Sequence, residues 1–242
     1  MPKIPKLIGT LVKTAWSKMF IDVKVVEKIQ LTNSLLKIRF EGDLSNTNYQ
    51  VGQAILMQVS ATEYRNYSPS LYCPEEGYFE VIFHQKAKGP GTNFFKTIKE
   101  NDIVTTSIPR GQNMYDHNID YHYFYGDESC LGFCNHLQTT LKKDHKSLKG
   151  ILELEPTSVN YARSVLDNID IVSPSLIDKA ETAIDYLSSI DDFNWNRIKN
   201  GQFYIMGNAK SISTFRKALK DKGVSNRNIV SQPFWVEGKV GL

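Results

Sequence analysis

Three side chains with different chemistry, Arg65, Tyr67 and Ser68, follow closely on the apolar run 54–59. An arginine guanidinium carries paired donors that match the oxygens of a phosphate group. A tyrosine ring can lie against a flat ring system while its hydroxyl finds a polar partner, and a serine adds a small donor and acceptor. The three side chains therefore suit a flat, anionic ligand. The alternative interpretation is an exposed strand end with a loop arginine.

The segment Gly89, Pro90, Gly91 and Thr92 is a second candidate anion site. Small residues let the backbone approach a ligand, and the N–H groups and dipole at a helix start attract negative charge. We expect a helix over residues 93–99, with Thr92 as its N-cap residue. A diphosphate would then be held from two sides, by this helix and by the arginine. A tight turn with an ordinary N-cap is the alternative.

A third candidate site follows Gly126, where Asp127, Glu128 and Ser129 occupy a strand-to-helix turn. Doubly wound sheets bind nucleotides at this kind of turn. The two acids stand where a pyrophosphate would approach, so the segment departs from the glycine-rich fingerprint. They could contact a nicotinamide amide or position a protein donor. A structural role, with Ser129 as an ordinary N-cap, is the alternative.

The rest of the chain supplies two domains for these segments. Residues 21–116 predict an antiparallel β-barrel, because short apolar or aromatic runs alternate with turn residues. These runs lie at residues 22–26, 35–40, 54–59 and 78–84. Residues 117–242 alternate strands and helices, which predicts a doubly wound parallel sheet. We expect strands near residues 121–125, 150–154, 169–172, 203–206 and 229–231, and helices near 131–141, 175–189 and 211–220.

Residues 1–20 form a separate N-terminal segment. They contain four lysines, no acid, and apolar residues at helical spacing, which predicts an amphipathic helix. This helix either packs on the barrel or lies on an anionic membrane surface.

The composition limits the classes of function. A net charge of +3 over 242 residues gives no indication of nucleic-acid binding. Three cysteines are too few for a disulfide framework or for the four thiolates of an iron–sulfur cluster. We therefore expect a cytoplasmic protein without a metal site, in which an organic cofactor would carry any electrons. No window approaches the roughly 20 apolar residues of a spanning helix.

The motifs resemble, in order and spacing, the ferredoxin reductase superfamily and within it the siderophore-interacting, ferric-reductase branch. The resemblance runs from about residue 21 to residue 235 and rests on Arg65-x-Tyr67-Ser68 and on the segments 89–92, 108–111 and 126–129. It implies an FAD-dependent enzyme that passes electrons from NADH, NADPH or a protein donor through the flavin to a ferric siderophore, which releases the iron. Two alternatives stay open: a general NAD(P)H-dependent flavin or ferredoxin reductase, and a non-enzymatic flavin- or siderophore-binding protein. We expect a monomer.

The resemblance also implies roles for single residues. It assigns Arg65 and Tyr67 to the pyrophosphate and ring of FAD, and Ser68, as the catalytic residue, to the neighbourhood of the reactive ring nitrogen. Further contacts to FAD or to the nicotinamide coenzyme are expected from His84, Gly89, Pro90, Gly91, Thr92, Asp127, Glu128, Ser129, Gly207, Lys210 and Trp235. For His84 the alternative is a solvated or packed histidine. Val236 departs from the family pattern, which has a basic residue at this place.

Overall fold

The computed structural model describes residues 19–85, 89–175 and 177–239. The chain divides between Tyr115 and Asp116 into two compact units, and each is described by itself. The helix expected over residues 1–20 lies outside the described residues except for its last two positions, of which Phe20 already begins a strand. None of the helices in the described ranges combines the length and the hydropathy that crossing a bilayer requires.

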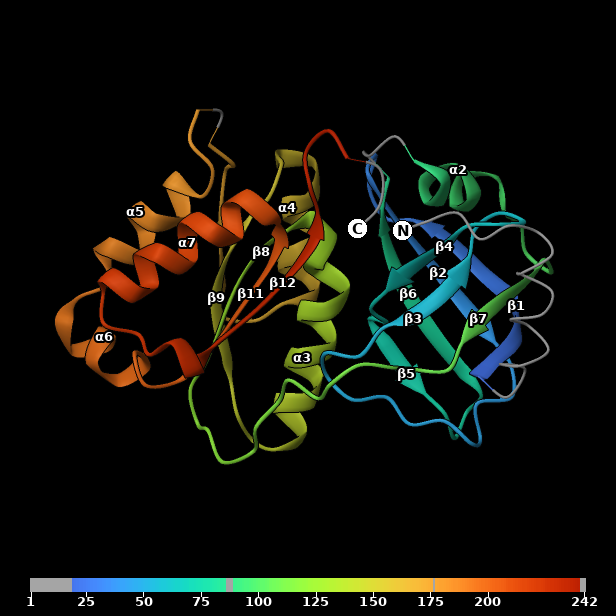
Figure 1. Ribbon diagram of the computed structural model, residues 1–242, viewed down its shortest axis with the longest axis horizontal. Coiled ribbons are helices and arrows are strands. Elements are labelled where there is room, and N and C mark those ends of the chain that lie inside the picture. Colours follow the sequence, from blue (N-terminus) through green and yellow to red (C-terminus); the bar gives the residue numbers. More distant parts are fainter. Residues whose placement is uncertain (1–18, 86–88, 176, 240–242) are drawn as a thin grey trace. The chain divides into compact units, whose positions relative to one another are not determined.

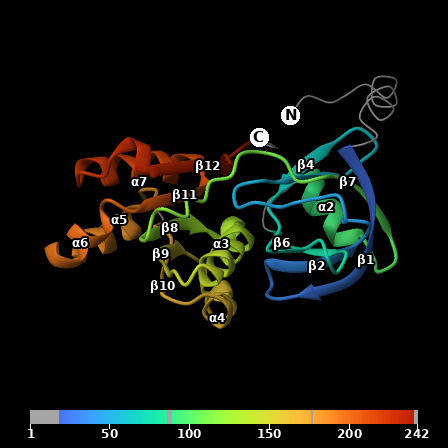
Figure 2. The ribbon, with the colours of Figure 1, turned by 90° about the horizontal axis from the view of Figure 1, so that it is seen from below.

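The first unit is built on one antiparallel sheet of seven strands (Figure 1). The strands are β1 (Phe20–Gln30), β2 (Leu35–Glu41), β3 (Ile55–Gln58), β4 (Tyr64–Tyr67), β5 (Leu71–Cys73), β6 (Tyr78–His84) and β7 (Ile103–Ser107), and α2 (Pro90–Thr97) joins β6 to β7. Their spatial order is β4-β3-β7-β1-β2-β6-β5, which leaves β4 and β5 at the edges. The sheet curves into a half-barrel, so the predicted antiparallel barrel architecture is confirmed (Figure 2).

Strand β2 illustrates how the sequence sets the faces of this sheet. Leu36, Ile38 and Phe40 alternate along the strand and are at most 1% exposed. Between them Arg39 points outward and pairs with Glu80 on β6 at 2.6 Å. Burying each apolar side chain contributes about 1.5–3 kcal/mol, whereas a partly exposed ion pair contributes about 1 kcal/mol or less. The apolar alternation therefore decides which face of the strand is inside.

The second unit is a five-stranded sheet in which all neighbours run parallel. Its strands are β8 (His122–Asp127), β9 (Leu148–Glu153), β10 (Ile169–Val172), β11 (Gln202–Asn208) and β12 (Ile229–Trp235), in the spatial order β10-β9-β8-β11-β12. The helices α3 (Leu131–Lys143) and α4 (Pro156–Val165) cover one face, and α5 (Glu181–Ser189) and α7 (Ala209–Asp221) cover the other (Figure 2). The predicted doubly wound parallel sheet is confirmed. Cys130 and Cys134, at the start of α3, are fully buried packing residues.

Several helix predictions need correction. The helix expected over residues 175–189 begins only at Glu181. Two helices, α4 and the short α6 (Asp192–Ile198), were missed. Their exposed faces carry mostly polar residues, and each buries only two side chains: Ser158 and Ala162 in α4, and Trp195 and Ile198 in α6. A stripe of two residues is too short to give a helical period in the sequence.

His136, on α3 of the second unit, makes the stability of the fold depend on pH. Burial, with a smaller contribution from the charge of Lys143, lowers the pKa of this histidine from 6.5 to about 4. The unfolded chain therefore binds a proton between these pH values that the folded chain does not bind. Since stability rises with pH wherever the unfolded state holds more protons, the contribution is present above pH 6.5 and is lost as the pH falls toward 4.

We predict that the free energy of unfolding of the second unit falls by up to about 3 kcal/mol between neutral pH and pH 4 on account of His136. The substitution His136→Gln should flatten this part of the profile, measured by urea unfolding at a series of pH values. The matched control is His117→Gln, since His117 is exposed. If the free energy of unfolding falls equally steeply with pH in His136→Gln and in the unaltered protein, His136 is not the source of the pH dependence.

Candidate functional site

In the first unit, Tyr67 at the end of β4 is held by aromatic rings from two other elements. Its ring centroid lies 4.8 Å from that of Phe83 on β6 and 5.2 Å from that of Phe95 on α2, both edge-to-face. Phe83 and Phe95 stack on each other at 3.7 Å. Burial raises the pKa of Tyr67 well above its usual range, so the phenol is neutral at physiological pH. The hydroxyl is therefore a rigidly held, uncharged polar group.

Helix α2 begins directly beside this tyrosine. A Cβ atom at Gly91 would lie 2.3 Å from the Tyr67 hydroxyl oxygen and 3.6 Å from Cγ of Arg65. Only a glycine permits this approach without displacing the ring. The structure thus brings together Arg65, Tyr67 and Gly91, three of the residues that the sequence singled out.

The start of α2 differs from the prediction that Thr92 would be the N-cap. The N-cap is Gly89, which supplies no side-chain acceptor, and Pro90 occupies the first helical position. Proline is favoured there because a helix needs no N–H at that position and the fixed φ of proline suits the helix. The N–H groups of Gly91 and Thr92 belong to the first turn and have no intrahelical acceptor. Such a helix start attracts an anion.

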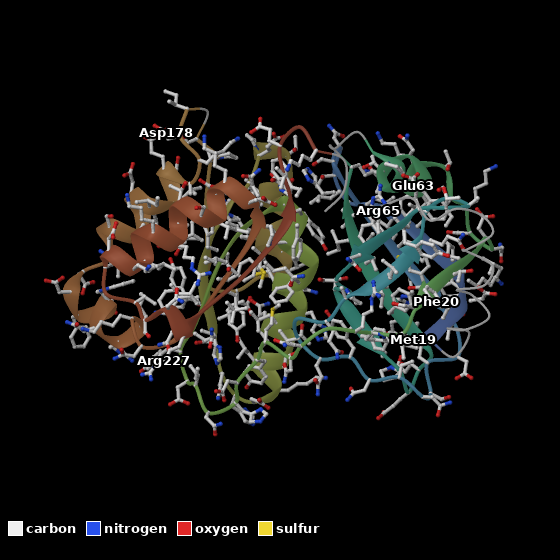
Figure 3. All side chains as sticks on the ribbon, viewed as in Figure 1. Met19, Phe20, Glu63, Arg65, Asp178 and Arg227 are labelled. Carbon is white, nitrogen blue, oxygen red and sulfur yellow. The ribbon has the colours of Figure 1, made fainter. Side chains whose placement is uncertain are left out.

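Arg65 is positioned by the turn that precedes β4. Its guanidinium donates a hydrogen bond to the carbonyl oxygen of Tyr64 at 2.7 Å and lies 3.5 Å from Oε1 of Glu63. Figure 3 shows Glu63 and Arg65 next to each other. The Arg65 side chain is 17% exposed. Because a guanidinium has five N–H donors, these contacts leave donors for a ligand.

Ser68 and His84 also belong to the first unit. Ser68 directly follows Tyr67 and is partly buried, as is His84 at the end of β6. The segment 108–111 reaches β4 through Arg110, whose Nη2 donates to Oδ1 of Asn66 at 3.2 Å.

The residues present fit the diphosphate and ring of FAD. A guanidinium, a helix start without a side-chain cap, and a glycine that lets backbone come close all meet beside an aromatic ring. The sequence reasoning missed Glu63 and the two phenylalanines that hold the tyrosine. The sequence offered a signal for one of these phenylalanines, because Phe95 belongs to an aromatic pair that closely follows the Gly-Pro-Gly segment.

In the second unit, the carboxylate of Asp127, at the carboxyl end of β8, accepts hydrogen bonds from three segments of the chain. Its Oδ1 accepts hydrogen bonds from the backbone N–H of Ser129 at 2.9 Å and from the Ser129 hydroxyl. Its Oδ2 accepts from the backbone N–H of Asn208 and from the indole Nε1 of Trp235, both at 2.9 Å. Gly207, in the left-handed region with φ 106°, is required here because a Cβ would lie 2.4 Å from Asp127 Oδ2.

Two of the helix starts at this edge of the sheet are capped by side-chain oxygen atoms of the protein. Asp127, not Ser129, is the N-cap of the short helix before α3, which corrects the predicted capping role of Ser129. Oε1 of the buried Glu128 accepts from the N–H of Glu155, the residue before α4, and among the described residues no side chain caps the first turn of α4 itself. Oδ1 of Asn208 accepts from the N–H groups of Lys210 and Ser211 at the start of α7.

The charge at this edge is predominantly negative. Besides Asp127 and Glu128, Glu153 ends β9 as a buried carboxyl group, and the hydroxyl of Tyr125 donates to its Oε2 at 2.7 Å. Burial raises the pKa of Glu153, while the hydrogen bond from Tyr125 works against this change. Lys210 is exposed at the start of α7. Ser129, Gly207 and Trp235 thus each contact or closely approach Asp127. The key role of Asn208 was missed, although an asparagine before a helix is a typical N-cap.

Comparisons with known proteins place the first unit in a family. Residues 22–115 match the family model of the oxidoreductase FAD-binding domain. No curated protein matches the sequence.

Solved structures match over both units. A siderophore utilization protein from T. fusca has a TM-score of 0.75 at 17% identity, over 92% of this chain and 95% of the other. The siderophore-interacting protein SipS from Aeromonas hydrophila has a TM-score of 0.73 at 16% identity, over 91% and 93%. Phthalate dioxygenase reductase, described as a modular structure for electron transfer from pyridine nucleotides to [2Fe-2S], has a TM-score of 0.71 at 14% identity, over 92% and 70%.

Longer proteins contain the same fold as one part. Full-length CYP116B46 from Tepidiphilus thermophilus has a TM-score of 0.70 at 11% identity; the match spans 89% of this chain but only 29% of that protein. The chain therefore has a ferredoxin reductase-like fold with an FAD-binding domain. The two siderophore proteins have this same fold, so the resemblance to the ferredoxin reductase superfamily is confirmed at the level of the fold.

We predict that Gly91→Ala weakens FAD binding at least about tenfold, because the added methyl group must displace the Tyr67 ring from its edge-to-face contacts with Phe83 and Phe95. Overpacking of this kind costs about 1–3 kcal/mol, and 1.4 kcal/mol corresponds to a factor of ten. Flavin content after purification and a fluorescence titration with FAD provide the measurement. Asn93→Ala, at an exposed position of the same helix, is the matched control. Equal FAD affinity in both variants would count against this placement of the site.

Proposed function

We propose that this protein is an FAD-dependent oxidoreductase that passes electrons from NADH, NADPH or a protein donor to a ferric siderophore, so that the iron is released. The observation that carries the proposal is the meeting of Arg65, Tyr67 and the start of α2 in the unit that matches an FAD-binding domain. A cytoplasmic location and a monomeric state are part of the proposal.

The chain's own residues bind and orient the cofactor. Arg65 would hold the diphosphate together with the N–H groups of Gly91 and Thr92. Tyr67, fixed by Phe83 and Phe95, would lie against the cofactor and offer it a hydrogen bond from its neutral hydroxyl. Ser68, the next residue in the chain, would orient the reactive part of the ring. FAD itself supplies the chemistry of accepting two electrons and releasing them singly.

The siderophore is proposed as the acceptor on the strength of the fold. Two of the matching solved structures carry siderophore utilization or siderophore interaction in their names. Ferric iron would be a substrate bound in its chelate, and within the described residues no group of three or more metal-ligating side chains forms a metal site in this chain.

The donor is proposed to meet the carboxyl edge of the second unit, where Asp127, Glu128, Ser129, Gly207, Lys210 and Trp235 lie. One observation favours a protein donor over a nicotinamide dinucleotide. Backbone N–H groups at two helix starts on this edge, those of the short helix before α3 and of α7, are taken by Asp127 and Asn208, and the local charge is negative. A diphosphate would have to compete with these oxygens.

An anaerobic visible spectrum of the purified protein tests the proposal. Supplied FAD should give a flavin spectrum, which a donor bleaches and a ferric siderophore restores. Bleaching by NADH or NADPH would identify a nicotinamide donor, and bleaching only by a reduced ferredoxin would identify a protein donor. The absence of bound flavin after supplying FAD would rule out the proposed function. Flavin that a ferric siderophore does not reoxidise would rule out the proposed acceptor.

We predict that Arg65→Ala lowers FAD affinity by about 10- to 100-fold, because hydrogen bonds to charged groups contribute about 1.5–3 kcal/mol. The matched control is Glu63→Gln, which removes the carboxylate 3.5 Å from the guanidinium and leaves the arginine in place. This variant should bind FAD at least as tightly as the unaltered protein. Unchanged flavin content in Arg65→Ala would contradict the role of the arginine.

A further inference from the structure

The hydrogen bond between Trp235 and Asp127 joins two strands of the second unit that are not neighbours. In the sheet, β11 lies between β8 and β12 (Figure 1). The indole Nε1 of Trp235, at the end of β12, nevertheless donates to Oδ2 of Asp127, at the end of β8, at 2.9 Å. The two side chains that form this bond must therefore span the end of β11.

The end of β11 borders the switch point of the sheet. The chain proceeds from β8 to β9 and β10 on one side of β8, and then continues with β11 and β12 on the other side. Open parallel sheets bind nucleotides in the crevice outside the carboxyl ends of the strands where the order reverses. Those strands are β8 and β11, and Oδ2 of Asp127 also accepts from the N–H of Asn208 at the end of β11. The hydrogen-bonded pair of Asp127 and Trp235 therefore lies across the crevice that a dinucleotide would use.

An ion pair spans the same edge of the sheet. Nζ of Lys179 lies 3.4 Å from Oε2 of Glu237. Lys179 follows β10 and Glu237 follows β12, and these are the strands at the two opposite sides of the sheet. Burial raises the pKa of Glu153, at the end of β9, and the nearby charge of Lys179 works against this change. A lysine that is near enough to meet a phosphate at this edge is thus already paired with a carboxylate of the chain.

Trp235 is held at this edge without filling the core. It is 38% exposed and does not belong to the apolar core described for the second unit. Its N–H donates to a carboxylate, and hydrogen bonds to charged groups are stronger than those between neutral groups. The indole is therefore tethered over the crevice, and a ligand that enters there must displace it.

We propose that Trp235, positioned by Asp127, determines which class of electron donor the protein accepts, because it closes the crevice to nicotinamide dinucleotides. The ion pair of Lys179 with Glu237 supports the closure by keeping a cation from the phosphates. The acidic side chains at this edge add repulsion of a diphosphate. A donor protein needs no crevice and meets the exposed face of the indole instead. This inference rests on the proposed function, since it concerns the donor of that reaction.

Isothermal titration calorimetry of the full chain with NAD⁺ and with NADP⁺ tests the proposal. The oxidised coenzymes cannot reduce a flavin, so the titration measures binding alone. We expect binding to Trp235→Ala to be at least about tenfold tighter than binding to the unaltered protein, because entry no longer requires breaking a hydrogen bond to a charged group. Trp235→Phe, which keeps a ring but lacks the N–H, should show a smaller gain. No gain of affinity in Trp235→Ala would overturn the proposal.

Two controls separate the cover from unspecific effects. Phe193→Ala truncates another aromatic of the second unit, 73% exposed on α6, and should leave the affinity for both coenzymes unchanged. Glu237→Gln frees Lys179 and should tighten binding about two- to fivefold. Asp221→Asn removes an exposed acid at the last position of α7, about 18 Å along the helix from this edge, and should not tighten binding. Equal gains in Glu237→Gln and Asp221→Asn would mean that net charge alone acts, and would overturn the role of the ion pair.

The result can be told apart from the outcome for the proposed function. The titration requires neither bound FAD nor a siderophore, so a protein without flavin would reject the proposed function and still report on the crevice. A gain of affinity is also a readout that a purely structural role of Trp235 would not give, because a loss of stability does not create a nucleotide site. The melting temperature of Trp235→Ala shows whether the variant is folded. If it is not, the gain of affinity is required of Trp235→Phe, and its absence there overturns the proposal.

Discussion

The close approach of α2 to β4 is the constraint on which the candidate cofactor site depends. It is possible only because Gly91 has no side chain, since a Cβ there would lie 2.3 Å from the Tyr67 hydroxyl. Phe95, which is 1% exposed, anchors the helix in the core of the first unit and stacks on Phe83. Core packing thus fixes both the helix start and the ring beside it. A ligand would meet these groups already in place, without a loss of side-chain freedom on binding.

The helix starts of the two units are capped in different ways. In the first unit, α2 begins at a glycine with no side-chain cap and a proline at its first position. In the second unit, side-chain oxygens of Asp127 and Asn208 accept from first-turn N–H groups of the short helix before α3 and of α7, whereas α4, like α2, begins with a proline and no side-chain cap. The same backbone N–H groups therefore form internal cross-links at two helix starts of the second unit and are not capped by a side chain at α2. Asp127 is central to these cross-links because one carboxylate joins the end of β8, the end of β11 and the end of β12.

The sequence alone determined the two-domain architecture and most of the strands. Apolar alternation at residues 35–40 and the repeated strand-then-helix pattern after residue 117 are local signals, and the structure contains the strands that they predict. The sequence also singled out Arg65, Tyr67 and Gly91, because their residue types already suggest anion binding. It did not reveal α6 or the correct start of α2, since a helix with two buried residues or with a proline at its first position has a weak period.

Only the tertiary structure decided which of these residues meet. Asp127 and Trp235 are 108 positions apart in the chain, yet the indole donates to the carboxylate, which no spacing rule predicts. The ion pair of Lys179 with Glu237 likewise joins segments that follow the strands at opposite sides of the sheet. Contacts of this kind depend on the order of strands in the sheet, whereas periodicity reports only which face of an element is buried. The sequence therefore fixes the chemistry that is available, and long-range packing determines where it is assembled.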